Sequence, residues 1–139
     1  MRKTKYGVSV DLQMDFDAAI KKTTERLKEQ GFGVLTDIDV QKTLKEKLDV
    51  DFVKYHILGA CNPPLAHKAL QAEEEIGLML PCNVIVYETG EKRCRVAAID
   101  VTAAMSVVGN EDLTPIADEV AHKLADVMTS LSEDYSDKE

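Results

Sequence analysis

The chain has 139 residues and a formal net charge of −8, and apolar residues make up 45% of it. This length fits one compact domain, and this apolar content is too high for a disordered chain. The negative charge argues against a nucleic-acid partner, because binding to phosphates needs a basic face.

The N-terminal segment is basic, but the apolar stretch that a signal peptide contains does not follow it. No apolar run approaches the roughly 20 residues that span a membrane. We therefore expect a soluble cytoplasmic protein without a membrane partner. In a reducing cytoplasm, Cys61, Cys82 and Cys94 are expected to be free thiols.

The chain begins with a predicted strand and a predicted helix. Apolar residues alternate over 6–12, which indicates a strand with one buried face, and Asp15 suits the N-cap of the helix that follows. Gly31 is the left-handed residue expected to end this helix, with Leu27 against Phe32 in a Schellman-type closure.

Two more strands are predicted over 33–39 and 52–60. The segment between them, 40–50, is charged and poor in apolar residues, so we expect a solvated surface segment there. Alternation along the second of these strands places His56 on the face opposite to Cys61, which argues against a partnership between the two.

Two further helices have clear start signals. Asn62 suits the N-cap and Pro63 the first position of a helix that Gly77 can end. The last helix is predicted to begin at Thr114, with Pro115 at its first position. Its apolar stripe is the clearest in the chain and consists of Ile116, Val120, Leu124, Val127 and Leu131.

A β-hairpin is predicted over 82–101, between these two helices. The register that sets Val84 opposite Val96 and Val86 opposite Cys94 pairs apolar with apolar residues, and a shift by one would not.

The predicted order of elements is therefore β-α-β-β-α-β-β-α. This order favours an α+β domain with an antiparallel or mixed sheet and with helices packed on one face. We expect a single domain over 1–132 and a polar, disordered tail over 133–139.

The stretch 59–83 is where a chemical site is expected. Cys61 comes directly before a helix N-terminus, where the helix dipole favours a thiolate. Pro63 and Pro64 both lack an N–H, however, which makes this helix end a weaker anion site than usual.

A weak candidate for a metal site consists of Cys61, Cys82 and His67, which would suit zinc or copper(I), although their spacing is not that of a zinc finger. The two thiols can meet only if the strands that carry them are antiparallel. Cys94 lies too far along the hairpin from Cys82 for a disulfide and is interpreted as a core residue.

Five short motifs resemble a known family: GF at 31–32, DID at 37–39, CNP at 61–63, LPCNV at 80–84 and VGN at 108–110. With them the chain is similar to the bacterial and archaeal domain-of-unknown-function 302 family, from about Tyr6 to Leu131. The residue after Asp100 is Val101, where we would expect proline.

The resemblance implies a single α+β domain related to the TATA-binding-protein-like fold, commonly a homodimer. It implies no catalytic role. Its motifs identify five candidate ligand-binding residues, which are Cys61, Asn62, Pro63, Pro81 and Cys82.

Three functions remain open at this stage. The first is a homodimeric module that binds a small ligand or a metal near the CNP and LPCNV motifs. The second is a dimeric interaction protein in which these motifs only shape turns. The third is an enzyme or thiol redox protein that depends on Cys61, although no sequence neighbour supplies the base that such chemistry needs.

Overall fold

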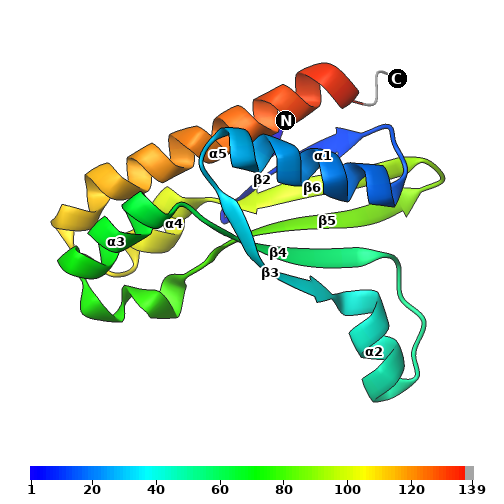
Figure 1. Cartoon of the computed structure of the whole chain (residues 1–139), viewed down its shortest axis with the longest axis horizontal. Coiled ribbons are helices and arrows are strands. Elements are labelled where there is room, and N and C mark those ends of the chain that lie inside the picture. The colour runs from blue at the N-terminus through cyan, green and yellow to red at the C-terminus, as the bar shows by residue number, and fades with distance from the viewer. Residues whose placement is uncertain (137–139) are drawn as a thin grey trace.

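The computed structural model describes residues 1–136 and contains one six-stranded sheet, in the order β1-β2-β6-β5-β4-β3 (Figure 1). All neighbouring strands pair antiparallel. The strands are β1 (Arg2–Lys3), β2 (Gly7–Leu12), β3 (Gly33–Asp39), β4 (Tyr55–Cys61), β5 (Cys82–Gly90) and β6 (Arg93–Ile99).

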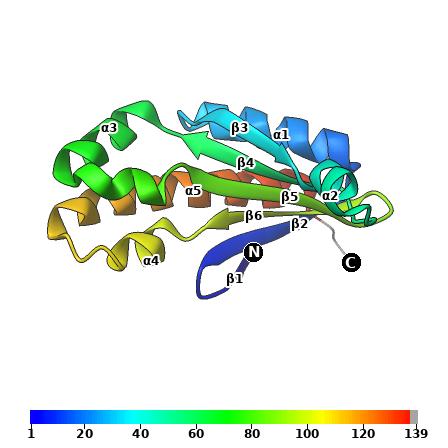
Figure 2. The same cartoon turned by 90° about the horizontal axis from the view of Figure 1, so that it is seen from below.

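Helices α1 and α5 cover one face of this sheet, and in Figure 2 both lie behind the strands. The predicted α+β class is thereby confirmed, and the sheet is antiparallel. Within residues 1–136, no helix is both long and apolar enough to cross a membrane. The helices are α1 (Phe16–Glu29), α2 (Val40–Leu48), α3 (Pro63–Ala72), α4 (Val101–Ser106) and α5 (Thr114–Tyr135), with 3-10 turns η1 (Glu74–Met79) and η2 (Glu111–Leu113).

The end of α1 forms the closure that the sequence predicts. Gly31 has a φ of 86°, and its backbone N–H donates to the carbonyl of Lys28 at 3.0 Å. The N–H of Phe32 donates to the carbonyl of Leu27 at 2.9 Å, which completes a Schellman motif. This closure turns the chain directly from α1 into β3.

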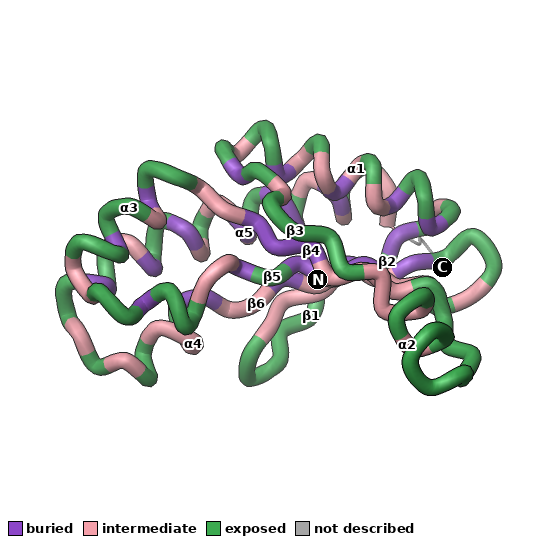
Figure 3. Tube along the Cα trace, turned by 60° about the horizontal axis from the view of Figure 1, so that its bottom comes forward, coloured by how far each residue is buried: buried purple, intermediate pink, exposed green. Residues whose placement is uncertain are grey.

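Alternation along the strands divides the sheet into a covered and an open face. On the covered face, Val10, Val96 and Val86 lie side by side on β2, β6 and β5 and are buried beneath the helices. Figure 3 shows buried residues along the central strands and along α1 and α5. The open face is covered by neither α1 nor α5 and carries half-buried side chains such as Ile57 and Ile85.

The segment expected to be a solvated stretch is helical over Val40–Leu48. Its surface character is confirmed, because none of its residues is buried, and Figure 3 shows α2 as an exposed arm. Asp39 supplies the missing start signal, since its side chain accepts a hydrogen bond from the N–H of Lys42 at 2.9 Å.

Three other elements differ from the prediction, one in its end and two in their existence. The predicted helix after Asn62 ends at Ala72, before Gly77, and a 3-10 turn follows it. The side chain of Asn110 explains this end, because its Nδ2 donates to the carbonyl of Ala72 and to Oε1 of Glu73, both at 3.0 Å. The sequence reading also missed α4, which the side chain of Asp100 caps, and the two-residue β1.

The predicted hairpin register is wrong by two residues. Val84 pairs with Ala98 and Val86 with Val96, so Cys94 pairs with Glu88 instead of Val86. A bulge between Glu88 and Gly90 shifts the pairing next to the turn, where Gly90 pairs with Arg93. A shift by two keeps every side chain on its own face, so the apolar pattern does not distinguish these two registers.

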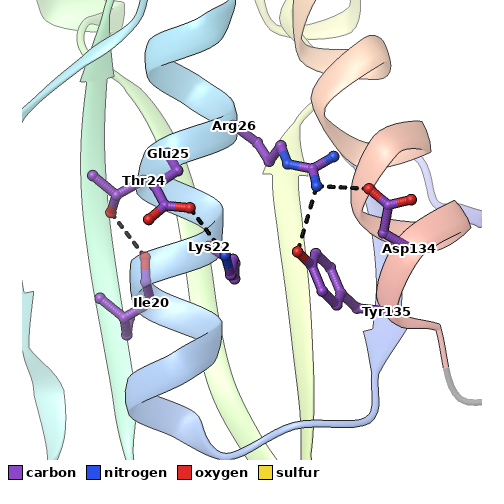
Figure 4. Close-up of polar contacts among 7 residues, drawn as sticks. All are labelled: Ile20, Lys22, Thr24, Glu25, Arg26, Asp134 and Tyr135. Carbon is purple, nitrogen blue, oxygen red and sulfur yellow. Dashed lines mark hydrogen bonds and ion pairs between the residues drawn. The ribbon is translucent and has the colours of Figure 1, made fainter.

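The last helix extends through Tyr135, beyond the expected domain end at residue 132. Figure 4 shows its final turn beside α1, where Nη2 of Arg26 lies 2.6 Å from Oδ2 of Asp134 and 3.5 Å from the Tyr135 hydroxyl. Leu12 forms a bridge to Ser136. The first part of the predicted tail is therefore packed against α1 and β2, and residues 137–139 lie outside the described part.

Candidate functional site

A cavity of about 280 Å³ lies where β4 ends and β5 begins. It separates the main core from a smaller apolar cluster that Ala69, Ile76 and Leu113 form. Its walls come from β3, β4, β5, α3, α4 and α5, so no single element creates it. The side chains that line it include Phe32, Leu65, Val101, Met105, Ile116 and Val120.

The antiparallel pairing of β4 and β5 brings two of the three cysteines to this cavity. Ala60 pairs with Cys82, which makes the chain neighbour Cys61 adjacent to it across the strands. Cys61 is half-buried, Cys82 is buried, and both line the cavity. The condition under which the sequence allowed the two thiols to meet is therefore fulfilled.

Pro81, another predicted site residue, lines the cavity beside Gly59. A Cβ on Gly59 would overlap the Thr36 side chain and would lie 2.8 Å from Cγ of Pro81. Glycine is required here because Thr36 and Pro81 close over the backbone of β4.

Asn62 also lines the cavity, but its amide group is engaged in the fold. Its Oδ1 accepts from the N–H of Leu65 at 3.3 Å and caps α3, while its Nδ2 donates to the carbonyl of Gln30 at 3.5 Å. Pro63 is exposed and does not contribute to the wall. Three of the five candidates line the cavity and, unlike Asn62, do not cap a helix with their side chains. These are Cys61, Pro81 and Cys82.

Burial raises the pKa of the Cys82 thiol from 9.0 to about 11, and the nearby Cys61 adds to this shift. Cys82 is therefore a neutral thiol at physiological pH. Cys94 is also buried and has a pKa near 11, but it lies at the other end of the sheet and donates to the carbonyl of Met14 at 3.4 Å. The prediction that Cys94 is a core residue is confirmed.

The histidines lie away from the two cavity thiols. His67 is exposed on α3 and does not line the cavity, and across residues 1–136 no three His, Cys, Asp or Glu side chains are arranged to hold a metal ion. His56 is five residues before Cys61 on β4, roughly 17 Å away. Its Nδ1 lies 2.7 Å from Oδ1 of Asp37, although the ring N–H is not aligned for a hydrogen bond.

Most of the cavity wall was not predicted from the sequence. Leu35, Thr36, Val101 and Met105 line it, yet in the sequence they look like ordinary strand and helix residues. Leu35 stands out only in the structure, where a bulge in β3 breaks the alternation and leaves this leucine 68% exposed. An exposed leucine within a strand marks the mouth of the cavity.

The cavity has no charged lining residue among those that the structure describes. Three other hollows, of about 310 to 480 Å³, differ because charged side chains line each of them. Asp118, Asp100 and Lys45 are examples, one in each hollow. The cavity at Cys61 and Cys82 therefore differs from these three hollows in the absence of charged side chains from its described lining.

Comparisons with known proteins agree with the fold. A crystal structure of the uncharacterized conserved protein DUF302 from Bacillus stearothermophilus is similar to this chain, with a TM-score of 0.84 and 28% sequence identity. The match covers 92% of this chain and 99% of that one. No curated protein matches the chain in sequence. The family described as "Domain of unknown function DUF302" matches residues 8–131, and the chain therefore belongs to this family.

Proposed function

We propose that this protein is a small-molecule binding module whose ligand occupies the cavity at Cys61, Pro81 and Cys82. The observation that carries the proposal is a cavity of about 280 Å³ whose described lining is apolar and uncharged and which lies against the buried core. Protein interiors are normally close-packed, and a persistent hollow is the usual place for a bound ligand.

The energetics favour occupation of this cavity. Its walls include residues that are almost fully buried, such as Phe32, Val101 and Leu113. A molecule that covers apolar wall and displaces water gains about 25 cal/mol for each Å². The wall itself offers no general base, because no Asp, Glu or His of the described residues lines it, so binding is better supported than cysteine catalysis.

The test is a cavity-filling variant on α3. Ala66 lines the cavity, whereas Lys68 on the same helix is exposed and does not. We expect the unmodified protein to bind the uncharged ten-carbon fluorophore 1-naphthylamine with a blue shift of its emission, A66F to lose this binding and K68F to keep it. Absence of binding to the unmodified protein, or equal binding by both variants, would contradict the proposal.

A second feature supports a homodimer. The open face of the sheet carries Ile57, Ile85 and Ala97 in one row, with Tyr55 stacked on Tyr87 at a ring distance of 5.2 Å. Antiparallel sheets that face water usually carry polar residues on that side, so an apolar row there favours a protein partner.

We infer that the partner on the open face is a second copy of this chain. Beside the row, Arg95 pairs with Asp11 at 2.7 Å, which partly balances the charge that such a contact would cover. We expect the unmodified protein to be a dimer by native mass spectrometry and I85D to be a monomer. T129D places the same charge at an exposed position of α5, and this variant should stay dimeric. A monomeric unmodified protein would contradict this assembly. The same spectra would reveal a retained metal ion, which the Cys61, Cys82 and His67 hypothesis predicts.

A further inference from the structure

The cavity changes in polarity from its mouth to its interior. Leu35, which is 68% exposed, and the exposed Thr36 lie at the sheet edge and mark the mouth. Ala60, Leu65 and Val101 lie deeper, where at most 4% of each residue is exposed. A ligand that enters here places an apolar part inside and keeps its other end beside β3.

The polar groups in the wall include an amide, a hydroxyl and a buried thiol. The Asn62 amide is occupied by Leu65 and Gln30. The Cys82 thiol remains protonated at physiological pH because burial raises its pKa to about 11. The Thr36 hydroxyl lies over Gly59 beside Pro81 and can both donate and accept a hydrogen bond. These groups suit an uncharged polar end of a ligand.

A charged ligand is disfavoured at this site. Burying a charge without a partner is costly, and no Lys, Arg, Asp, Glu or His of the described residues lines the wall to provide one. An anionic ligand also meets a chain with a net charge of −8. A fatty acid would therefore lack the cation that its carboxylate needs.

The volume limits the size of the ligand. An apolar cavity of about 150 Å³ accommodates benzene, and this one, with about 280 Å³, is nearly twice as large. By proportion it accommodates about ten to twelve carbon atoms.

We propose that the ligand is an uncharged molecule of about ten carbon atoms with an apolar body in the cavity and one hydroxyl or carbonyl group at the mouth, beside Thr36 and Cys61. This inference rests on the proposed binding function and specifies the chemical class of the ligand. If this inference is right, the protein distinguishes ligands by their charge as well as by their size.

The experiment uses displacement of 1-naphthylamine from the full chain by three probes of equal length. These are 1-decanol, decanoate and decylammonium, each below its critical micelle concentration. We expect 1-decanol to displace the dye at a concentration at least tenfold lower than either ion. Displacement by decanoate or decylammonium at the same or a lower concentration than 1-decanol overturns the inference.

A variant at the mouth tests the orientation. T36K places a cation where the polar end of the ligand is expected, and it should shift the preference at least tenfold toward decanoate. An unchanged preference would contradict the placement of the polar end at Thr36. K68F provides the surface control and should keep the original preference.

The two proposals fail in different ways. If the dye does not bind, or binds A66F and the unmodified protein equally, the binding function itself is wrong. If the dye binds, is lost in A66F and is displaced equally by all three probes, only the ligand class is wrong.

Discussion

The two buried cysteines of the hairpin allow a comparison between the two ends of the sheet. Cys82 and Cys94 are both buried, and burial raises the pKa of each thiol to about 11. Cys94 contacts packed neighbours and donates to the Met14 carbonyl, whereas Cys82 faces a cavity of about 280 Å³. The same residue type with a similarly raised pKa is therefore packed in the core at one end and lines a cavity at the other.

The comparison shows that burial and pKa do not identify a site by themselves. Packing around the thiol is what differs, because a close-packed neighbourhood leaves no volume for a second molecule. The cavity end combines the short α4, a 3-10 turn and a bulged strand, whereas at the other end Phe16 of the long helix α1 lies against the sheet. Because a strand bulge occurs at both ends, the short α4 and the 3-10 turn are what distinguish the cavity end.

The largest expected effect contrasts a packed leucine with one at the cavity mouth. Leu124 is 2% exposed in the core, so L124A should lower the free energy of unfolding by about 2–5 kcal/mol. Leu35 is 68% exposed, and L35A should lower it by less than about 0.5 kcal/mol. Urea unfolding measures both values. A loss below about 1 kcal/mol in L124A would show that α5 is not docked as described.

The next effect concerns access to the thiols. Cys82 faces the cavity and Cys94 does not, so N-ethylmaleimide at pH 8 should label Cys82 at least tenfold faster than Cys94. Mass spectrometry of peptides measures the two rates in one sample. A66F should slow the labelling of Cys82 and leave the labelling of Cys94 unchanged. Equal rates for both cysteines would mean that opening of the whole domain, rather than the cavity, exposes them.

A smaller effect is expected in alkali. Both thiols have a folded-state pKa near 11, above the ordinary value of 9.0. The unfolded chain therefore loses these two protons at lower pH than the folded chain, so stability falls as pH rises from about 9 to 11. The variant carrying C82A and C94A should show a shallower fall than the unmodified protein in urea unfolding across this range. An identical pH dependence would contradict the raised pKa values.

The smallest expected effect lies at the contact between α1 and α5 (Figure 4). Asp134 pairs with Arg26 at 2.6 Å, but its side chain is 51% exposed. Exposed ion pairs contribute about 0–1 kcal/mol, so D134N should lower the free energy of unfolding by less than about 1 kcal/mol. The effect should decrease at high salt, and a salt-independent loss would indicate packing instead of charge.

The parts of the fold that the sequence predicts are those with local signals. Gly31 ends α1 and Asn62 caps α3, because capping involves atoms only a few residues apart. The α5 stripe is predicted for the same reason, since Val120, Leu124 and Val127 follow the helical period. Asn110 of the VGN motif has a role that no local pattern reveals. Its side chain donates a hydrogen bond to the carbonyl of Ala72 at the end of α3, 38 residues earlier in the chain.

The candidate site was only partly predictable. Its position near Cys61 and Cys82 followed from the motifs, but the sequence left open whether these residues meet. Their meeting depends on the antiparallel pairing of β4 with β5. The hairpin register was mispredicted because alternation has a period of two and permits shifts by two.

The amino-acid sequence by itself determined the class of the fold, the starts of α1, α3 and α5, the end of α1 and the buried faces of β2, β5 and β6. These follow from periodicity and capping, which act within a few residues. The tertiary structure decided the order of the strands, the register of the hairpin and the existence of the cavity. A cavity is space that several separate elements leave unfilled, and its volume depends on how they pack together rather than on any one stretch of the chain.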